Sequence, residues 1–139
     1  MKHIHTLLAI ITILSSSSFV AGIIGPNDIT GLYWSPKKDA RIEIYRKGKE
    51  YYGKFVWLAN PRKDSENPDE SLQNRDVLGL EFLSGFTFDD GEYTGGRIYD
   101  PETGKTYSCK MSIAGNKLKV RGYVGISLFG RTEYFERIK

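Results

Sequence analysis

The stretch 95–132 constrains the fold more than any other part of this sequence, because turn residues and alternating strands follow one another without a break. Turn chemistry occurs at Asp100-Pro101 and at Gly115-Asn116, since proline presets φ and glycine or asparagine tolerates a positive φ. Between these turns, apolar and polar side chains alternate over 107–113, which is the period of a half-buried strand. The stretch therefore predicts consecutive antiparallel strands joined by tight turns.

The same alternation, broken by turn residues, recurs through the rest of the chain, and no segment carries a capped stripe of helical period. We expect strands or short apolar segments at 29–34, 41–45, 50–58, 77–82, 86–88, 92–99, 105–114, 117–124 and 132–138. The hairpin signal at Asp89-Asp90-Gly91 is the strongest of the short turns. An all-β fold follows, namely an up-and-down antiparallel barrel of about eight strands with little helix, and a two-sheet sandwich is the second choice.

The first 22 residues have the layout of a secretory signal peptide rather than of a folded element. Lys2 provides a positive start, an apolar stretch follows, and small residues precede an expected cut after Gly22. An uncleaved N-terminal anchor is the alternative. The sequence thus predicts a signal peptide at 1–22 and a single domain at 23–139, exported to the periplasm or the medium, with no membrane span after cleavage.

The composition excludes several classes of function. The only histidines, His3 and His5, lie in the predicted signal peptide, so the folded domain has no imidazole for general base catalysis or for metal binding. The single cysteine, Cys109, cannot form an internal disulfide, and its place on the apolar side of a strand predicts a buried small side chain. The formal net charge is +3, or +2 once Lys2 is removed with the predicted signal peptide, and bases and acids are interleaved. A balance so close to zero provides no field for nucleic acid or for anionic lipid. We expect no cofactor.

The region 60–76 interrupts the strands with a long polar loop rich in acids and prolines. Such loops are common at the mouths of barrels and at functional edges. Its acids suggest calcium, but a loop of EF-hand type starting at Asp64 would have Asp69 where glycine is needed and Arg75 where the bidentate glutamate belongs. We therefore predict a solvated loop and no metal site.

Nearly the whole of 23–139 resembles the exported bacterial family known as domain of unknown function 2147. The matching residues are Gly31, Trp34, Asp64, Asn67-Pro68-Asp69, Gly79-Leu80, Gly96 to Tyr107, Leu118 to Tyr123 and Gly130-Arg131-Thr132. The resemblance implies an exported lipocalin-like (calycin-like) barrel without an assigned activity. Some members carry a cysteine pair in the long loop, which this chain lacks. Residues expected to shape the fold are Gly31, Trp34, Asp100, Pro101, Gly104, Gly122, Gly130 and Arg131.

Lipocalins also begin with a glycine and a tryptophan on the first strand, and an arginine from the last strand covers that tryptophan. In this chain Gly31 and Trp34 are one residue further apart than in that motif. The resemblance predicts that Arg131 or Arg137 stacks on Trp34 and closes the barrel floor.

Three functions remain open on the sequence alone. The first is a barrel that binds a small apolar or amphipathic molecule, for which the candidate residues are Tyr33, Phe55, Trp57, Tyr107, Arg121 and Tyr123. The second is an envelope interaction or structural module with a packed, ligand-free barrel. The third is an enzyme that uses carboxylates, from Asp64, Asp69, Asp76 and Asp100, but no spacing pairs any two of them, so no catalytic residue is assigned.

Overall fold

The computed structural model describes residue 22 and residues 24–139. The predicted signal peptide, apart from Gly22, and the residue after the expected cut lie outside the described residues. Within the described part of the chain, no helix is long and apolar enough to cross a membrane.

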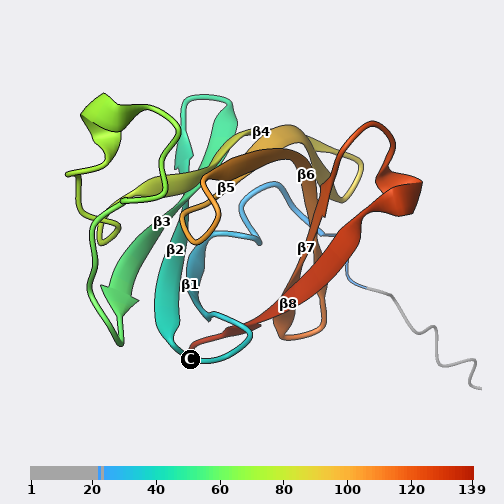
Figure 1. Ribbon diagram of the computed structural model, residues 1–139. Coiled ribbons are helices and arrows are strands. Elements are labelled where there is room, and N and C mark those ends of the chain that lie inside the picture. The colour runs from blue at the N-terminus through green and yellow to red at the C-terminus, as the bar shows by residue number, and fades with distance from the viewer. Residues whose placement is uncertain (1–21, 23) are drawn as a thin grey trace, which may run out of the picture.

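Eight antiparallel strands close into one barrel in which each strand pairs with its neighbour in sequence (Figure 1). They are β1 (Gly31–Trp34), β2 (Ala40–Lys47), β3 (Glu50–Leu58), β4 (Glu81–Asp89), β5 (Glu92–Asp100), β6 (Lys105–Ala114), β7 (Lys117–Tyr123) and β8 (Arg131–Arg137). Two short 3-10 helices, η1 (Glu70–Leu72) and η2 (Ser127–Phe129), lie in the loops. The barrel closes where β1 pairs with β8 through Tyr33 with Arg137 and Trp34 with Glu136. The expected up-and-down barrel is confirmed, and the sandwich is excluded.

One strand differs from the expectation. The sequence predicts two separate segments at 77–82 and 86–88, but β4 runs unbroken from Glu81 to Asp89. Its pairing with β3 shifts register twice, between the partners of Tyr51 and Gly53 and between those of Gly53 and Lys54. A bulge of this kind accommodates the extra residue without ending the strand. The glycine at position 85 therefore marks an irregularity within a strand and does not mark a turn.

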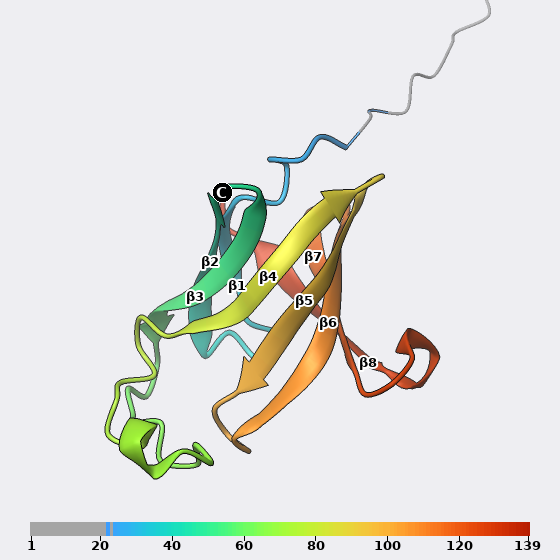
Figure 2. The same cartoon turned by 90° about the horizontal axis from the view of Figure 1, so that it is seen from above.

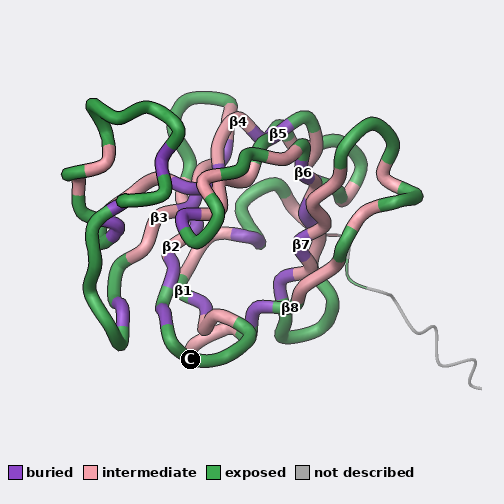
Figure 3. Tube along the Cα trace, viewed as in Figure 1, coloured by how far each residue is buried: buried purple, intermediate pink, exposed green. Residues whose placement is uncertain are grey.

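Buried side chains from all eight strands form one hydrophobic core inside the barrel. Figure 3 marks the buried positions along the chain in purple. At two positions the packing leaves room only for glycine: a Cβ on Gly96 would lie 2.5 Å from ring carbons of Phe86, and a Cβ on Gly53 would lie 2.8 Å from Leu83. Contacts this close do not occur between non-bonded carbon atoms, because their van der Waals radii would overlap, so Phe86 and Leu83 already fill the space at these two positions. Both side chains are 0% exposed, which shows that the middle layer of the barrel is closely packed around them.

An N-terminal arm, residues 25–30, closes one end of the barrel (Figure 2). Ile29 is fully buried there, the Tyr33 hydroxyl donates to its carbonyl at 2.8 Å, and the Tyr93 hydroxyl donates to the Pro26 carbonyl at 2.8 Å. The sequence suggested a loose arm over 23–27. The arm from Gly25 onward is bound instead, because buried tyrosine hydroxyls need acceptors and its carbonyls supply them.

The lipocalin-type floor contact exists in this barrel, but with different residues. The Arg137 guanidinium lies 4.8 Å from the centre of the Tyr33 ring and also donates to the Thr30 carbonyl at 3.0 Å. Tyr33, two residues after Gly31, thus occupies the inward position expected for tryptophan. Because side chains alternate along a strand, Trp34 points outward.

Trp34 instead belongs to a cluster on the outside of the barrel. Its ring meets the Trp57 ring edge to face at 5.9 Å, and Arg41 lies 4.4 Å from the Trp34 ring centre. The prediction that Arg131 or Arg137 covers Trp34 is therefore wrong. Arg131 lies in the exposed start of β8 and pairs with Glu133 at 3.0 Å.

The closed end predicts a loss of stability at alkaline pH. Burial raises the pKa of Tyr33 and of Tyr93 to about 12. Because these folded-state values lie above the unfolded value near 10, the stabilisation is complete below about pH 10 and is lost as the pH rises towards 12. Over this range the melting temperature should fall as tyrosinate absorbance rises, and Tyr93→Phe should remove part of the dependence. Titration of both hydroxyls near pH 10 in an intact barrel would contradict this.

Candidate functional site

The long loop, residues 59–80, is an ordered structure packed against the barrel. Its two limbs pair through Lys63 and Asp76, with backbone bonds from Asp64 N to Arg75 O at 2.9 Å and from Val77 N to Arg62 O at 3.0 Å. Val77 is fully buried and forms a second small core with Leu58 and Ala40. Most of the predicted solvated loop, 60–76, is exposed, but Asp64 and Asn67 are buried and a paired backbone holds the loop against the barrel.

A buried carboxylate organises the loop. Asp64 is 0% exposed, and its two oxygens accept hydrogen bonds from the Tyr99 hydroxyl at 2.6 Å, from Asn67 Nδ2 at 2.9 Å and from Arg75 Nε at 2.8 Å. Tyr99 comes from β5, so this cluster joins the loop to the barrel wall. A buried charge is tolerated only when it is paired and hydrogen-bonded, as this one is.

The surroundings of Asp64 keep it ionised. Burial alone would raise the pKa of its carboxyl group, but hydrogen bonds from Tyr99, Asn67 and Arg75, together with the charge of Arg75, lower the pKa below its ordinary value. The same carboxylate and burial raise the pKa of the Tyr99 hydroxyl to about 12, with burial as the larger cause. Asp64 therefore serves as a fixed acceptor that positions Tyr99 and Arg75, and it is unsuited to proton transfer near neutral pH.

The turn between β5 and β6 receives the long loop. Asp100 caps this turn by accepting from Glu102 N at 2.9 Å, and Pro101 is buried. Gly104 has φ +74°, and a Cβ at this position would lie 2.0 Å from the Glu66 carbonyl oxygen of the loop. Only glycine permits both the backbone conformation and the close approach. Asp100, Pro101 and Gly104 were expected to shape the fold, and they form the turn against which the long loop packs.

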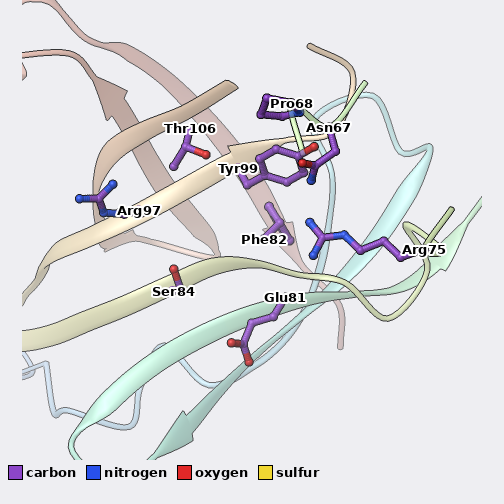
Figure 4. Close-up of a pocket in the computed structure, with 9 residues that line it drawn as sticks. All are labelled: Asn67, Pro68, Arg75, Glu81, Phe82, Ser84, Arg97, Tyr99 and Thr106. Atoms are coloured by element: carbon purple, nitrogen blue, oxygen red, sulfur yellow. The ribbon is translucent and has the colours of Figure 1, made fainter. Parts of the chain in front are cut away.

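A cleft of about 290 Å³ lies between the long loop and the outer surface of the barrel (Figure 4). Leu83 and Ile98 pair across β4 and β5 and face the core, so their neighbours Ser84, Arg97 and Tyr99 project outward. We call this space the outer cleft. The residues that line it are Asn67, Pro68, Arg75, Glu81, Phe82, Ser84, Arg97, Tyr99 and Thr106.

Two arginines stand at opposite ends of the outer cleft, with the rings of Phe82 and Tyr99 between them (Figure 4). Arg75 is fixed by its Nε bond to Asp64, and Phe82 is fixed by stacking on Phe55 with ring centres 4.1 Å apart. Among the described residues, the Arg97 side chain makes no hydrogen bond or ion pair within the protein. The arrangement can hold an anion beside an apolar group.

The acid in the outer cleft, Glu81, is already neutralised by partners on the barrel wall. Its carboxylate accepts a short hydrogen bond from the Tyr45 hydroxyl and pairs with Lys47 Nζ at 3.0 Å. Burial together with the Glu81 carboxylate raises the pKa of the Tyr45 hydroxyl well above its ordinary value. With Asp64 bound to Arg75 and Glu81 bound to Tyr45 and Lys47, the charge left facing the cleft is positive.

The six residues predicted from sequence to bind a ligand do not come together. Tyr33 lies at the end closed by the arm, Trp57 lies outside against Trp34, and Tyr107 points inward from β6. Arg121 holds the loop between β7 and β8, and Tyr123 lies on the outer face at the end of β7. Phe55 supports the outer cleft from behind through Phe82.

None of the nine residues that line the cleft was predicted from sequence to bind a ligand, including the four that matter most, Arg75, Phe82, Arg97 and Tyr99. A usable signal existed for two of them, because Arg97 and Tyr99 share one face of a strand within the Gly96 to Tyr107 motif. No such signal existed for Arg75, which reaches the site through the fold of the loop.

The remaining candidates for chemistry have structural partners. Asp69 caps η1 through Ser71 N at 3.0 Å, and Asp76 pairs with Lys63 at 2.7 Å. The Cys109 thiol is buried in the core, and this burial raises its pKa to about 12, which leaves it unreactive at neutral pH. Within 24–139, no group of three or more acidic, histidine or cysteine side chains is placed to hold a metal ion.

Comparison with known proteins identifies the fold and the family. Protein HP1028 from the human pathogen Helicobacter pylori, described as belonging to the lipocalin family, has a similar structure with a TM-score of 0.74 and 24% sequence identity. The similarity covers 81% of this chain and 84% of that one, and at this identity it shows the fold alone. No curated protein matches the chain.

The family whose sequences match is described as an uncharacterized protein conserved in bacteria, DUF2147, and the match covers residues 31–137. It spans all eight strands together with the long loop and the turn at Gly104. Because this match covers far more than half of the sequence, the chain belongs to the DUF2147 family and is a lipocalin-like barrel.

Proposed function

We propose that this protein binds a small amphipathic anion, such as a medium-chain carboxylate, in the outer cleft. The observation that carries the proposal is the pair of arginines, Arg75 and Arg97, on either side of an aromatic floor formed by Phe82 and Tyr99. An anionic head would lie on a guanidinium group, and the apolar chain would lie over Tyr99, because Phe82 is only 4% exposed.

Arg75 supports this assignment because it is positioned in advance. Asp64 accepts a hydrogen bond only from Nε of Arg75. The two terminal nitrogens of Arg75 make no hydrogen bond to any described residue. A guanidinium held through one nitrogen can present the other two as a fork to a carboxylate or phosphate. A side chain that is already fixed loses little conformational entropy when a ligand binds.

The size and charge of the cleft define the class of ligand. A volume of about 290 Å³ lies at the lower limit for small-molecule sites, so the ligand is small. The charge of Glu81 is offset by Lys47 and that of Arg75 by Asp64, so a cationic ligand would meet the unpaired charge of Arg97 with no free acid among the described residues to offset it. The site therefore favours an anion over a cation of the same shape.

The packing of the interior also favours the outer cleft as the binding site. The sequence predicted a small apolar or amphipathic ligand held by the barrel, which in a lipocalin-like fold suggests the lumen. Around Gly53 and Gly96 the lumen has no room for even one added methyl group. Binding there would require the core to open, whereas the outer cleft is already accessible. If the chain is exported as predicted, the ligand would come from the periplasm or the medium.

Titration with decanoate tests the proposal, with decanol as the uncharged ligand of the same chain length. We expect decanoate to bind and decanol to bind at least about tenfold more weakly, a difference of about 1.4 kcal/mol. The variant Arg97→Gln should weaken decanoate binding by a similar factor, because it removes one of the two cations. Its fold should be unaffected, since Arg97 makes no side-chain bond to a described residue.

A matched control for Arg97→Gln is available on the long loop. Arg62 is exposed, pairs only distantly with Glu102 at 3.9 Å, and does not line the cleft. The variant Arg62→Gln removes the same charge from the protein and should bind decanoate as the parent does. Equal losses in Arg62→Gln and Arg97→Gln would show a non-specific charge effect, and the proposal would then be abandoned.

The packed interior also supports a second function, the envelope interaction module. A barrel whose centre is filled by Phe86 and its neighbours can bind an envelope component through its outer surface without holding a ligand inside. If decanoate does not bind at all, this second function becomes the better account. Its strongest structural basis is the exposed apolar loop at 124–130, between β7 and β8.

A further inference from the structure

The loop between β7 and β8, residues 124–130, carries four apolar side chains that no described part of the protein covers. Their exposed fractions are 75% for Val124, 58% for Ile126, 73% for Leu128 and 79% for Phe129. Scattered apolar residues are normal on a surface, but four highly exposed ones within six positions of one loop are not scattered. Figures 1 and 2 show this loop projecting from the barrel.

Arg121 holds this loop in its exposed conformation. Its guanidinium donates to the Ser127 carbonyl at 2.6 Å, to the Leu128 carbonyl at 3.2 Å and to Thr132 Oγ1 at 2.6 Å. Two of these bonds satisfy the backbone carbonyls of Ser127 and Leu128 in η2, and the third joins Arg121 to the start of β8. The bonds from Arg121 fix the backbone of the loop while its apolar side chains stay exposed. The bonded carbonyl oxygens accept from the guanidinium and do not need water as a donor.

A positively charged groove adjoins the apolar loop. It has a volume of about 200 Å³, and Lys110, Lys119 and Arg121 contribute three cations to its lining against the single acid Glu92. These cations lie on the outer face of β6 and β7, where Lys110 pairs with Arg121 and Lys119 lies beside Ser112. Arg121 thus belongs both to the groove and to the base of the loop.

From this combination we propose that the β7–β8 loop inserts into the surface of an anionic phospholipid membrane, with the groove of Lys110, Lys119 and Arg121 bound to lipid phosphates. Apolar side chains beside basic residues are the recognised arrangement for binding at the interface of a bilayer. The role is separate from ligand binding in the outer cleft, which lies on β4, β5 and the long loop.

The shape of the loop favours a membrane over a protein partner. Stable protein interfaces bury roughly 800 Å² on each partner and are broad. The apolar surface here is instead one projecting turn with a few side chains, next to a groove lined by three cations and one acid. A bilayer accepts such a tip because its apolar region lies just beneath the charged head groups.

Sedimentation with vesicles tests the proposal. We expect the protein to bind vesicles of phosphatidylcholine with roughly 30% phosphatidylglycerol, and to bind pure phosphatidylcholine at least about tenfold more weakly. The double variant Leu128→Ser, Phe129→Ser should reduce binding to the anionic vesicles at least about tenfold, because the apolar tip is lost. Both side chains are exposed, so circular dichroism and melting temperature should match the parent.

The control is Leu72→Ser on the long loop, which changes an exposed leucine away from the proposed surface. Its 37% exposed side chain should not contribute, so vesicle binding should be unchanged. All variants carry the same N-terminus, so any contribution of residues 1–22 to binding is constant among them. The charge contribution is tested by Lys110→Gln, Lys119→Gln, which should weaken binding to anionic vesicles and leave binding to neutral vesicles unaltered.

Two results would overturn the proposal. If the parent does not sediment with anionic vesicles, the loop has another occupant, and a protein partner becomes the alternative. If Leu128→Ser, Phe129→Ser sediments as the parent does, the membrane is bound through another part of the chain.

Discussion

Replacing Asp64 with alanine is expected to lower the free energy of unfolding by about 3–5 kcal/mol. The carboxylate is fully buried and accepts from Tyr99, Asn67 and Arg75. Without it, the phenol and the amide lose their acceptor and Arg75 loses its counter-charge, so their desolvation is no longer offset. Urea unfolding of parent and variant measures the difference.

The matched control for Asp64 is the exposed ion pair on the same loop. Asp76 pairs with Lys63 at 2.7 Å, but both side chains are more than half exposed. Exposed pairs contribute little, so Asp76→Ala should cost less than about 1 kcal/mol. Comparable losses in the two variants would mean that the buried cluster does not organise the loop.

Acid titration provides a second readout of the same cluster. The pKa of Asp64 is lower in the folded protein than in the unfolded chain. Its stabilisation is therefore complete above the unfolded value of about 4 and is lost as the pH falls through the lower folded value. Asp64→Asn should reduce the dependence of stability on pH in that acidic range.

Gly96→Ala is expected to destabilise the barrel by about 2–3 kcal/mol, because the added methyl group overpacks the core. Its carbon would lie 2.5 Å from three ring carbons of Phe86, which is itself fully buried. Adding Phe86→Leu should recover part of the loss, since a smaller side chain leaves room. A double-mutant cycle in urea should show a coupling of at least about 1 kcal/mol.

The neighbouring glycine separates crowding from backbone strain. Gly95 has φ +72°, and a methyl group added there would meet no atom within 4 Å. Gly95→Ala should therefore cost about 1 kcal/mol through its backbone alone, and Phe86→Leu should not relieve that cost. If Phe86→Leu rescued both variants or neither, the packed middle layer would not be the cause.

The barrel could be predicted from sequence because its determinants are local. Alternation along β6 and β7 places Cys109, Met111, Leu118 and Val120 inside, and all four are buried as a strand of period two requires. The continuity of β4 through Ser84-Gly85 could not be recognised, because a bulge and a turn use the same residue types.

The contact between Arg137 and Tyr33 at the barrel floor shows how the aromatic residue of the lipocalin motif can be displaced by one position along the strand. The sequence offered Trp34 as the inward aromatic residue, since tryptophan is the residue of the lipocalin motif. The structure uses Tyr33, because the register of β1 against β8 pairs Tyr33 with Arg137. Register depends on pairing across the closed barrel, and a one-residue shift exchanges the inner and outer faces.

The outer cleft could not be predicted because it depends on distant segments. Arg75 reaches it only because Asp64 binds Tyr99 and because Gly104 lets the loop approach the turn. Asp64, Tyr99 and Gly104 belong to the motifs through which the chain resembles its family. In the folded protein they hold the long loop against β5 and β6, and this shared role is evident only in the three-dimensional structure.

The location of bound decanoate on the protein decides between the outer cleft and the lumen, and backbone amide NMR resonances followed during a titration would map it. Binding in the outer cleft predicts the largest changes at Arg75, Phe82, Arg97 and Tyr99, with the core residues Leu118 and Val120 unchanged. The reverse pattern, with changes at Leu118 and Val120 and none around Arg97, would place the ligand in the lumen and contradict the proposed site.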